Sequence, residues 1–265
     1  MRRLSVAHLT AINLPPPALI EAAAEAGFDA VGLRLLRVTP ESPGYPLMED
    51  APLLRATKAA LRETGIAVNV IDFIKLTPET SIPALLPMLD AGAELGASSV
   101  ITAPYDEDHS RLSDTLGTLS EAARARGLTA VLEFFPWTTV PDLATCTRIV
   151  EAAGPHTGLL VDSLHFDRSN SRLSDLESIP PERLPFAHLC DAPVSPPYSV
   201  EALLHTAREA RLPPGEGQIP LKPFLAALPE NLPLGLEIPM PAAAMADGPV
   251  AFLKRLHSAT RALLA

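Results

Sequence analysis

The sequence predicts an α/β protein folded as a single (β/α)8 barrel over residues 1–265, and three observations lead to this prediction. Short apolar runs rich in valine, isoleucine and leucine alternate along the chain with longer stretches whose apolar residues recur every three or four positions. Several of these longer stretches end at a glycine just before the next apolar run. The length of 265 residues suits eight such units, and no polar linker divides the chain.

The expected strands are the short apolar runs bounded by turn residues. They lie at Ser5–Thr10, Ala30–Leu35, Ala67–Phe73, Ser98–Ala103, Thr129–Phe134, Gly158–Asp162, Phe186–Cys190 and Leu234–Ile238. Because helices connect consecutive strands, the strands pair in parallel through right-handed crossovers, and eight such units close into the TIM-type barrel. A doubly wound open sheet is the alternative, but neither G-x-G-x-x-G after the first strand nor G-x-x-x-x-G-K-[ST] occurs in the sequence.

The expected helices are the amphipathic stretches between these strands. They lie at Pro16–Ala26, Ala51–Thr64, Ile82–Leu95, Asp108–Arg126, Pro141–Ala153, Leu173–Ile179, Ser199–Ala210, Leu221–Leu228 and Pro249–Leu264. Proline at the start of several helices costs no hydrogen bond. The glycines that follow helices fit left-handed C-caps, and they are Gly27, Gly65, Gly96, Gly127 and Gly154. The proline-rich segment Arg37–Glu49 is expected to be a loop over the mouth of the barrel.

Composition and charge restrict the classes of function. Hydrophobic residues make up 47% of the chain and charged residues 20%, which excludes an intrinsically disordered protein. The 21 Lys and Arg against 31 Asp and Glu give a net charge of −10, which argues against a nucleic-acid partner. No apolar run approaches the roughly 18 residues of a membrane span. No signal peptide is recognised, so we expect no membrane partner and a cytoplasmic location. The alanine-rich helices would permit a homo-oligomer.

Four consecutive expected strands each carry, at or near the carboxyl end, a side chain that can bind a metal ion. These side chains are Glu133, Asp162, His188 and Glu237. Because the chemistry of (β/α)8 barrels lies where strands end, the four are expected to converge. Three buried carboxylates beside one imidazole would repel one another without a cation. The oxygen-rich set favours one divalent ion, Mn²⁺, Mg²⁺ or Co²⁺, and tolerates Zn²⁺. Four separately ion-paired or solvated strand ends are the alternative.

Further residues are candidates for contact with a small-molecule substrate. His165 lies three residues after Asp162, is expected on the following loop, and could bind substrate or relay a proton. Arg211, in the segment before the last strand, is a candidate anion clamp, because guanidinium groups bind phosphate or carboxylate with two hydrogen bonds. Less specific candidates, each with a structural role as the alternative, are Asp191, Trp137, His8 and Asp72.

At these residues the sequence resembles the xylose isomerase-like TIM-barrel superfamily, which includes the sugar phosphate isomerases and epimerases. That superfamily places Glu, Asp, His and Glu on the last four strands, matched here by Glu133, Asp162, His188 and Glu237, and often a histidine three residues after the Asp, matched by His165. The resemblance implies a metal-dependent isomerase or epimerase of a small sugar, sugar phosphate or related polyhydroxy carbonyl compound. Glu133 or Glu237 would abstract the proton next to a metal-bound carbonyl, and the other glutamate or His165 would return it.

Two positions depart from the ketose 3-epimerases of this superfamily. Those enzymes carry an arginine six residues after the metal-binding histidine and a glutamate six residues after the first metal-binding glutamate, whereas this chain has Val194 and Thr139. The run from His188 to Pro193 with Arg211 is similar to a branch that contains 3-dehydroshikimate dehydratases and inosose-type enzymes. A dehydratase, which is a lyase, is therefore the alternative. A non-catalytic metal- or sugar-binding barrel and a phosphodiester hydrolase are further hypotheses.

Overall fold

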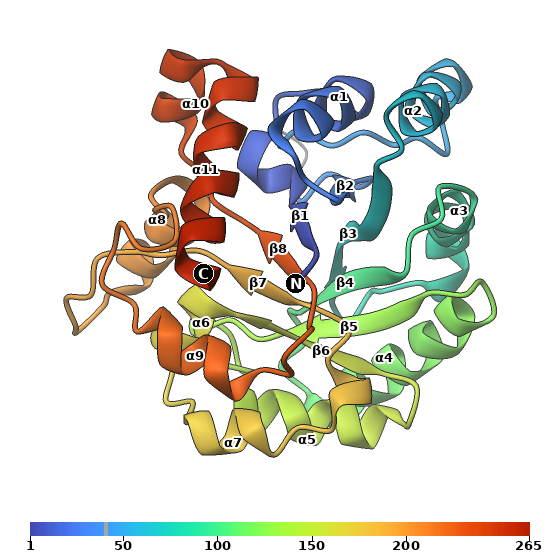
Figure 1. Cartoon of the computed structure of the whole chain (residues 1–265). Coiled ribbons are helices and arrows are strands. Elements are labelled where there is room, and N and C mark those ends of the chain that lie inside the picture. Colours follow the sequence, from blue (N-terminus) through green and yellow to red (C-terminus); the bar gives the residue numbers. More distant parts are fainter. Residues whose placement is uncertain (40–41) are drawn as a thin grey trace.

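The strands of the computed structural model, which describes residues 1–39 and 42–265, form a closed barrel. Within these residues eight strands follow one another in chain order, all pairs are parallel, and the last strand pairs with the first. Helices surround the strands (Figure 1). The predicted (β/α)8 barrel is confirmed.

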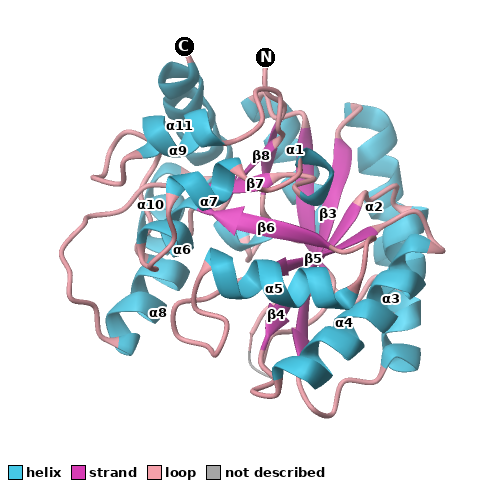
Figure 2. Ribbon diagram, turned by 90° about the horizontal axis from the view of Figure 1, so that it is seen from below, coloured by secondary structure: helices cyan, strands magenta, loops and turns pink. Residues whose placement is uncertain are grey.

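The strands are buried almost throughout, because one face lines the barrel interior and the other lies under the helices. Their bounds are Leu4–Val6 (β1), Ala30–Arg34 (β2), Ala67–Leu76 (β3), Ser99–Pro104 (β4), Thr129–Glu133 (β5), Gly158–Asp162 (β6), Ala187–Leu189 (β7) and Leu234–Leu236 (β8). Figure 2 shows the strands enclosed by helices, with both chain ends on the same side of the molecule.

The helices follow the predicted order, with short additions. Their bounds are Pro16–Ala26 (α1), Ala51–Thr64 (α2), Ile82–Glu94 (α3), His109–Arg124 (α4), Leu143–Ala153 (α5), Ser163–Asp167 (α6), Leu173–Glu177 (α7), Val200–Glu209 (α8), Leu221–Ala227 (α9), Pro241–Asp247 (α10) and Pro249–Leu264 (α11), with 3-10 turns at His8–Ala11 (η1) and Pro181–Arg183 (η2). Gly27 ends α1 with φ +91° and ψ +16°, as predicted. Gly154 ends α5 with φ +116° and ψ 176°, so the predicted left-handed cap is wrong there.

Three segments differ from the sequence-based expectation. The first strand stops at Val6, and η1 takes the rest of the expected strand because the Thr10 hydroxyl donates to the Leu236 carbonyl at 2.9 Å. The loop expected after β6 is the short helix α6, which the Asp162 carboxylate caps by accepting from the backbone N–H of Leu164 at 2.7 Å. The helix α10 precedes α11 and was not predicted; Gly248, with φ +75°, separates the two.

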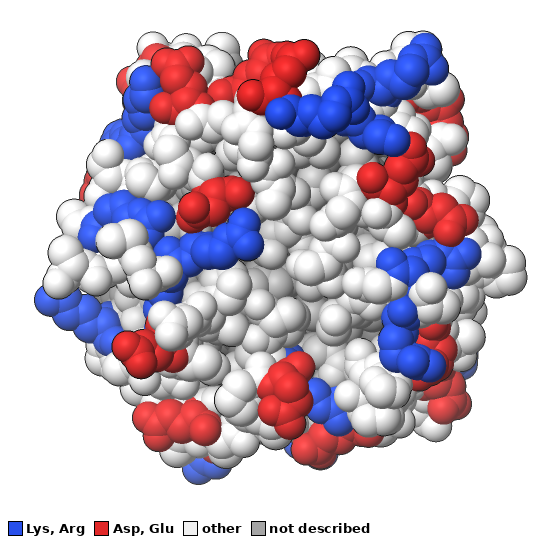
Figure 3. All heavy atoms as spheres, turned by 45° about the vertical axis from the view of Figure 1, so that its right-hand side comes forward, with Lys and Arg blue, Asp and Glu red and all other residues white. Residues whose placement is uncertain are grey.

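Charged side chains pair between neighbouring outer helices. Lys58 on α2 lies 2.6 Å from Glu94 on α3, and Arg126 after α4 lies 2.5 Å from Asp90 on α3. On the face in Figure 3, basic and acidic groups are interspersed around an uncharged centre. Such exposed pairs contribute little to stability, so the fold depends mainly on its apolar core. Among residues 1–39 and 42–265, no helix combines the length and the apolarity needed to cross a bilayer.

Candidate metal centre

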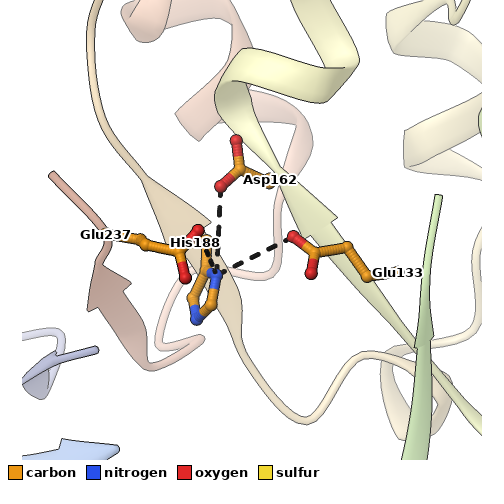
Figure 4. A group of neighbouring side chains, drawn as sticks. All are labelled: Glu133, Asp162, His188 and Glu237. Carbon is orange, nitrogen blue, oxygen red and sulfur yellow. Dashed lines mark ion pairs between the residues drawn. The ribbon is translucent and has the colours of Figure 1, made fainter. Parts of the chain in front are cut away.

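The side chains of Glu133, Asp162, His188 and Glu237 converge at the ends of β5, β6, β7 and β8. One ligand atom of each residue lies within 4.8 Å of the other three, and all four residues are buried. The Nδ1 atom of His188 lies 3.8 Å from Glu237 Oε2 and 3.9 Å from one carboxylate oxygen of Glu133 and one of Asp162 (Figure 4). The structure thus brings together the four residues that the sequence singled out, and this group could bind a metal ion.

The two-residue period of the strands explains why these four side chains face one another. Side chains two residues apart on a strand point to the same face. Residues Val131, Leu160 and Phe186 stand two positions before Glu133, Asp162 and His188, and they form an apolar cluster inside the barrel. The candidate metal centre therefore lies one layer beyond this cluster, toward the carboxyl ends of the strands.

On β8 the corresponding position is Gly235, which pairs with His188 in the sheet. A Cβ atom at Gly235 would lie 2.9 Å from His188 Cδ2 and 3.3 Å from His188 Nε2. The missing side chain therefore leaves the space that the imidazole ring occupies.

Two hydroxyl groups position the ligand-bearing strand ends, and the sequence reasoning missed both. Thr10 Oγ1 donates to Leu236 O and accepts from Ile238 N, both at 2.9 Å, and so holds the backbone on either side of Glu237. Ser163 Oγ donates to Cys190 O at 2.8 Å and accepts from Cys190 N at 2.9 Å, which ties the end of β6 to the chain just after β7. A sequence signal was available only for Ser163, which directly follows Asp162.

Arg211 is placed differently from the prediction. The sequence suggested a guanidinium free to clamp an anion, but Arg211 is buried and its Nη1 and Nη2 donate to Asp162 Oδ2 at 2.6 Å and Glu237 Oε2 at 2.7 Å. Its Nε donates to Ala207 O at 3.0 Å. Arg211 thus neutralises part of the negative charge of the candidate metal ligands, although it also lines the cavity described below.

The surroundings shift the pKa values of Glu133 and Asp162 in opposite directions. Burial, together with the charges of Glu237 and Asp162, raises the pKa of Glu133 well above its usual range. Burial also disfavours the charged form of Asp162, but the charge of Arg211 and its hydrogen bond outweigh burial, so the pKa of Asp162 is lowered. Three carboxyl groups with one arginine therefore remain short of positive charge.

Two ligand atoms of this group have no hydrogen-bond partner among the described residues. They are Glu133 Oε1 and His188 Nδ1, and both are buried. A buried polar atom without a partner costs about 1–3 kcal/mol. A divalent cation would pair with these atoms and supply the missing charge, so the donor set fits such an ion.

His165 lies in α6 rather than on the expected loop, and its ring faces the candidate metal centre. Its Nε2 lies 3.8 Å from Glu133 Oε1, and the side chain is buried. Burial and the charge of Arg211 outweigh the attraction of Asp162 and lower the pKa of His165 to about 3, so the ring is neutral at pH 7. The edge of His165 contacts the rings of Phe135 and Trp137, with centroids 4.9 and 5.2 Å apart.

Asp191 does not take the place suggested for a substrate carboxylate. Its Oδ1 accepts from the backbone N–H groups of Ala192 at 2.8 Å and Ile219 at 3.0 Å, and its Oδ2 accepts from that of Gly215 at 3.0 Å. The carboxylate thus shapes the loop between β7 and β8, and it lies outside the described lining of the cavity. Its structural alternative, a turn residue, agrees with these contacts.

A cavity of about 410 Å³ opens above the candidate metal centre. Its lining includes Glu133, Glu237, His165 and Arg211, and Trp137 belongs to an aromatic wall on one side. This wall consists of Phe73, Tyr105, Phe135 and Trp137. Residues 38, 39, 42 and 43 of the proline-rich segment also line the cavity, as expected for a loop over the mouth; Pro40 and Glu41 lie outside the described residues.

The fold and site together define a (β/α)8 protein with a buried acidic and histidine ligand set at the mouth of its barrel. The chain belongs to the xylose isomerase-like TIM barrel family, whose sequence model matches residues 20–256. The resemblance that the sequence suggested is therefore confirmed at the level of the family.

Comparison with curated proteins finds two relatives at 27% identity. One is the inosose isomerase of Halalkalibacterium halodurans, matched over 181 residues that cover 63% of this chain and 62% of the relative. The other is the 3-dehydroshikimate dehydratase of Pseudomonas putida, matched over 241 residues that cover 84% of this chain and 36% of the relative. The chain thus spans 62% and 36% of the lengths of these two relatives.

Comparison with solved structures supports the fold. The IOLI protein, solved with a bound zinc atom, superposes with a TM-score of 0.82 at 20% sequence identity, and the match covers 99% of this chain and 98% of that protein. At this level of identity the likeness concerns the fold, and the zinc atom belongs to the IOLI protein.

Proposed function

We propose that this chain is a divalent-metal-dependent isomerase or epimerase that acts on a small sugar, sugar phosphate or related polyhydroxy carbonyl compound. The observation that carries the proposal is the buried set Glu133, Asp162, His188 and Glu237 at the base of a cavity of about 410 Å³. Cavities of roughly 300–1,000 Å³ are typical of small-molecule sites. The name of the inosose isomerase supports an isomerase on this scaffold.

A dehydratase is the second candidate reaction. It is supported by the 3-dehydroshikimate dehydratase, which matches 84% of this chain. Isomerisation, epimerisation and dehydration all begin when a base removes the proton from the carbon next to a carbonyl group. Return of the proton to the neighbouring carbon isomerises the substrate, return to the opposite face epimerises it, and expulsion of a β-hydroxyl group as water dehydrates it.

The four converging residues would hold the ion, which when bound supplies a Lewis acid that acidifies the proton next to the substrate carbonyl. Glu133 and Glu237 both line the cavity, so either carboxylate can accept a proton from a substrate held there. They differ in their partners, because Arg211 donates to Glu237 Oε2, whereas Glu133 Oε1 faces the neutral ring of His165 at 3.8 Å. We assign proton removal to Glu133 or Glu237 and proton return to the other glutamate or to His165.

The aromatic wall would orient the substrate and exclude water. Phe135 and Trp137 are stacked, with ring centroids 5.0 Å apart, and both line the cavity beside His165. Aromatic faces of this kind provide an apolar surface for the carbon skeleton of a ligand, while polar groups bind its oxygen atoms. Trp137 is therefore proposed as a substrate-binding residue.

The first experiment measures the metal content of the purified protein by mass spectrometry, without chelator, for the wild type, His188→Ala and the control His205→Ala. His205 is exposed on α8, so its replacement should leave metal binding intact. We expect a divalent ion in the wild type and the control and its loss in His188→Ala. Absence of metal from the wild type, even after Mn²⁺ is offered, would refute the proposal.

Turnover is tested next with a panel of keto sugars, their phosphates, inososes and 3-dehydroshikimate. We expect Glu133→Gln and Glu237→Gln to lower the rate by about 10²–10⁴-fold, the usual contribution of an acid or base group. Circular dichroism checks that both variants remain folded. Full activity in both would contradict the assigned roles, and metal and ligand binding without turnover of any compound would favour a non-catalytic barrel.

A further inference from the structure

A second buried polar pair lies in the mouth of the barrel, on β2 and β3. Arg34 and Asp72 stand opposite each other in the sheet, and Arg34 Nη2 donates to Asp72 Oδ2 at 3.2 Å. Their side chains are 9% and 2% exposed. Arg34 lines the same cavity as the candidate metal ligands, and its guanidinium carbon lies 5.6 Å from the centre of the Phe73 ring in the aromatic wall.

Other contacts hold this pair in place. The backbone N–H of Arg34 donates to His8 Nδ1 at 2.9 Å, and His8 Nε2 lies 2.9 Å from Leu14 O. The His8 ring stacks on Tyr45, with centroids 5.0 Å apart. The end of β2 is thus fixed to the 3-10 turn η1, and Arg34 enters the cavity from a rigid strand end.

Each partner retains one polar atom without a hydrogen-bond partner in the part of the chain that the structure describes. These atoms are the donor Arg34 Nε and the acceptor Asp72 Oδ1. Because an unpaired buried polar atom is costly, the free donor of Arg34, whose side chain lines the cavity, points to a ligand that accepts a hydrogen bond there. The oxygen of a hydroxyl group can accept this bond without bringing a charge. A carboxylate or phosphate would accept from Arg34 but would be repelled by Asp72.

The charge of the cavity also favours an uncharged ligand. The described lining contains three arginines, at 34, 208 and 211, and three glutamates, at 133, 209 and 237. Asp72 and Asp162 add two negative charges, since they bind Arg34 and Arg211 directly. A divalent ion in the candidate metal centre would balance these charges, whereas an anionic substrate would add an uncompensated charge.

We propose that Arg34, neutralised and oriented by Asp72, is a specificity-determining residue that binds a hydroxyl group of the substrate. This inference rests on the proposed function and narrows its substrate class. The preferred substrate is an uncharged polyhydroxylated ketone, and its analogues with a phosphate or carboxylate group bind more weakly. Arg34 recognises the hydroxyl oxygen, and Asp72, which lies behind Arg34 and outside the described lining of the cavity, cancels the charge of Arg34 and orients its guanidinium.

The test measures ligand binding rather than turnover. Trp137 is the single tryptophan of the chain and lines the cavity, so its fluorescence reports cavity occupancy. The Mg²⁺-loaded protein is titrated with two matched pairs of probes, D-fructose against D-fructose 6-phosphate and myo-inositol against shikimate. We expect the wild type to bind the uncharged member of at least one pair about tenfold more tightly. Tighter binding of the anions, or no binding of either uncharged probe, would overturn the inference.

The Asp72→Asn variant removes the charge that cancels Arg34 and keeps the shape of the side chain. We expect it to shift the preference toward D-fructose 6-phosphate by at least about tenfold. Asp106→Asn is the matched control, because Asp106 is equally buried and paired with an arginine, but its partner Arg111 lies outside the described lining of the cavity, whereas Arg34 belongs to that lining. An equal shift in both variants, or none in Asp72→Asn, would contradict the role of Asp72.

Arg34→Gln keeps the inference testable if Asp72→Asn does not fold. We expect Arg34→Gln to lower the affinity for the uncharged probe about tenfold without creating affinity for the anions. Unchanged binding would overturn the role of Arg34. Metal content distinguishes this inference from the proposed function. Absence of a divalent ion would refute the proposed function. A bound ion together with tighter binding of anions would refute only the inference about the substrate.

Discussion

Replacing Arg211 by methionine should destabilise the metal-free protein strongly. Arg211 is 2% exposed and donates to Asp162 Oδ2 at 2.6 Å and to Glu237 Oε2 at 2.7 Å. Methionine fills much of the same volume but leaves both buried carboxylates without their cation. Removing one partner of a buried ion pair costs about 3–5 kcal/mol. At roughly 2–4 °C per kcal/mol for a chain of this size, the thermal midpoint should fall by about 6–20 °C.

A bound divalent ion should rescue the Arg211→Met variant, because the ion supplies positive charge to the same carboxylates. The assay is thermal unfolding followed by circular dichroism, with chelator and with excess Mn²⁺. We expect the difference between the midpoints of wild type and variant to be smaller with Mn²⁺. In chelator, the difference should also shrink as the pH falls. The charge of Arg211 lowers the pKa of Asp162 in the wild type, so the stability that this pair provides is present at higher pH and is lost as Asp162 becomes protonated.

The matched control is Arg255→Met, which breaks the exposed pair between Arg255 and Glu216. These side chains are 42% and 41% exposed and lie 2.5 Å apart. Exposed pairs contribute about 0–1 kcal/mol, so this variant should stay close to the wild type with or without Mn²⁺. Equal losses in the two variants, or a loss in Arg211→Met that Mn²⁺ does not change, would refute the role of Arg211 as the internal cation of the site.

Two further predictions concern residues around the site. Burial lowers the pKa of His8 from 6.5 to about 4. Between these pH values the unfolded state therefore binds more protons than the folded state. About 3 kcal/mol of the free energy of unfolding should be lost as the pH falls from 6.5 to 4. Thermal unfolding of His8→Gln should show a shallower slope in this range, and an unchanged slope would contradict the reasoning. Thr10→Val removes the hydroxyl that holds the backbone around Glu237, and we expect it to weaken divalent-ion binding by about 10–100-fold. Competition with a fluorescent chelator measures this affinity, and unchanged affinity in a folded variant would show that Thr10 does not position Glu237.

The barrel and the convergence of its four metal-competent residues could be predicted because both follow from local patterns. Glycine after a helix and alternating apolar segments identify the βα units, and parallel strands in a closed barrel present their carboxyl ends at one mouth. Glu133, Asp162, His188 and Glu237 therefore had to lie near one another once the strands were assigned correctly. The two-residue period then turned these side chains toward the barrel axis.

The roles of the surrounding residues could not be predicted, because they depend on partners that are distant in the sequence. Arg211 binds carboxylates 49 and 26 residues away, and Asp191 accepts from loop N–H groups up to 28 residues away. Nothing in the local sequence distinguishes these arrangements from an exposed arginine or a substrate carboxylate. Arg34 did carry a signal, because a charged residue near the end of the apolar run Ala30–Leu35 requires a buried partner.

The four candidate metal ligands come from the second half of the barrel, on β5 to β8, whereas Arg34, Asp72 and Phe73 come from β2 and β3. The candidate metal ligands and the proposed hydroxyl-binding residue therefore lie in separate stretches of the chain. Under the proposed function, substitutions in the first half would alter which compound is accepted while the candidate metal ligands stay untouched. A library confined to the ends of β2 and β3 and the loops that follow them is therefore the economical starting point for changing the specificity of this scaffold.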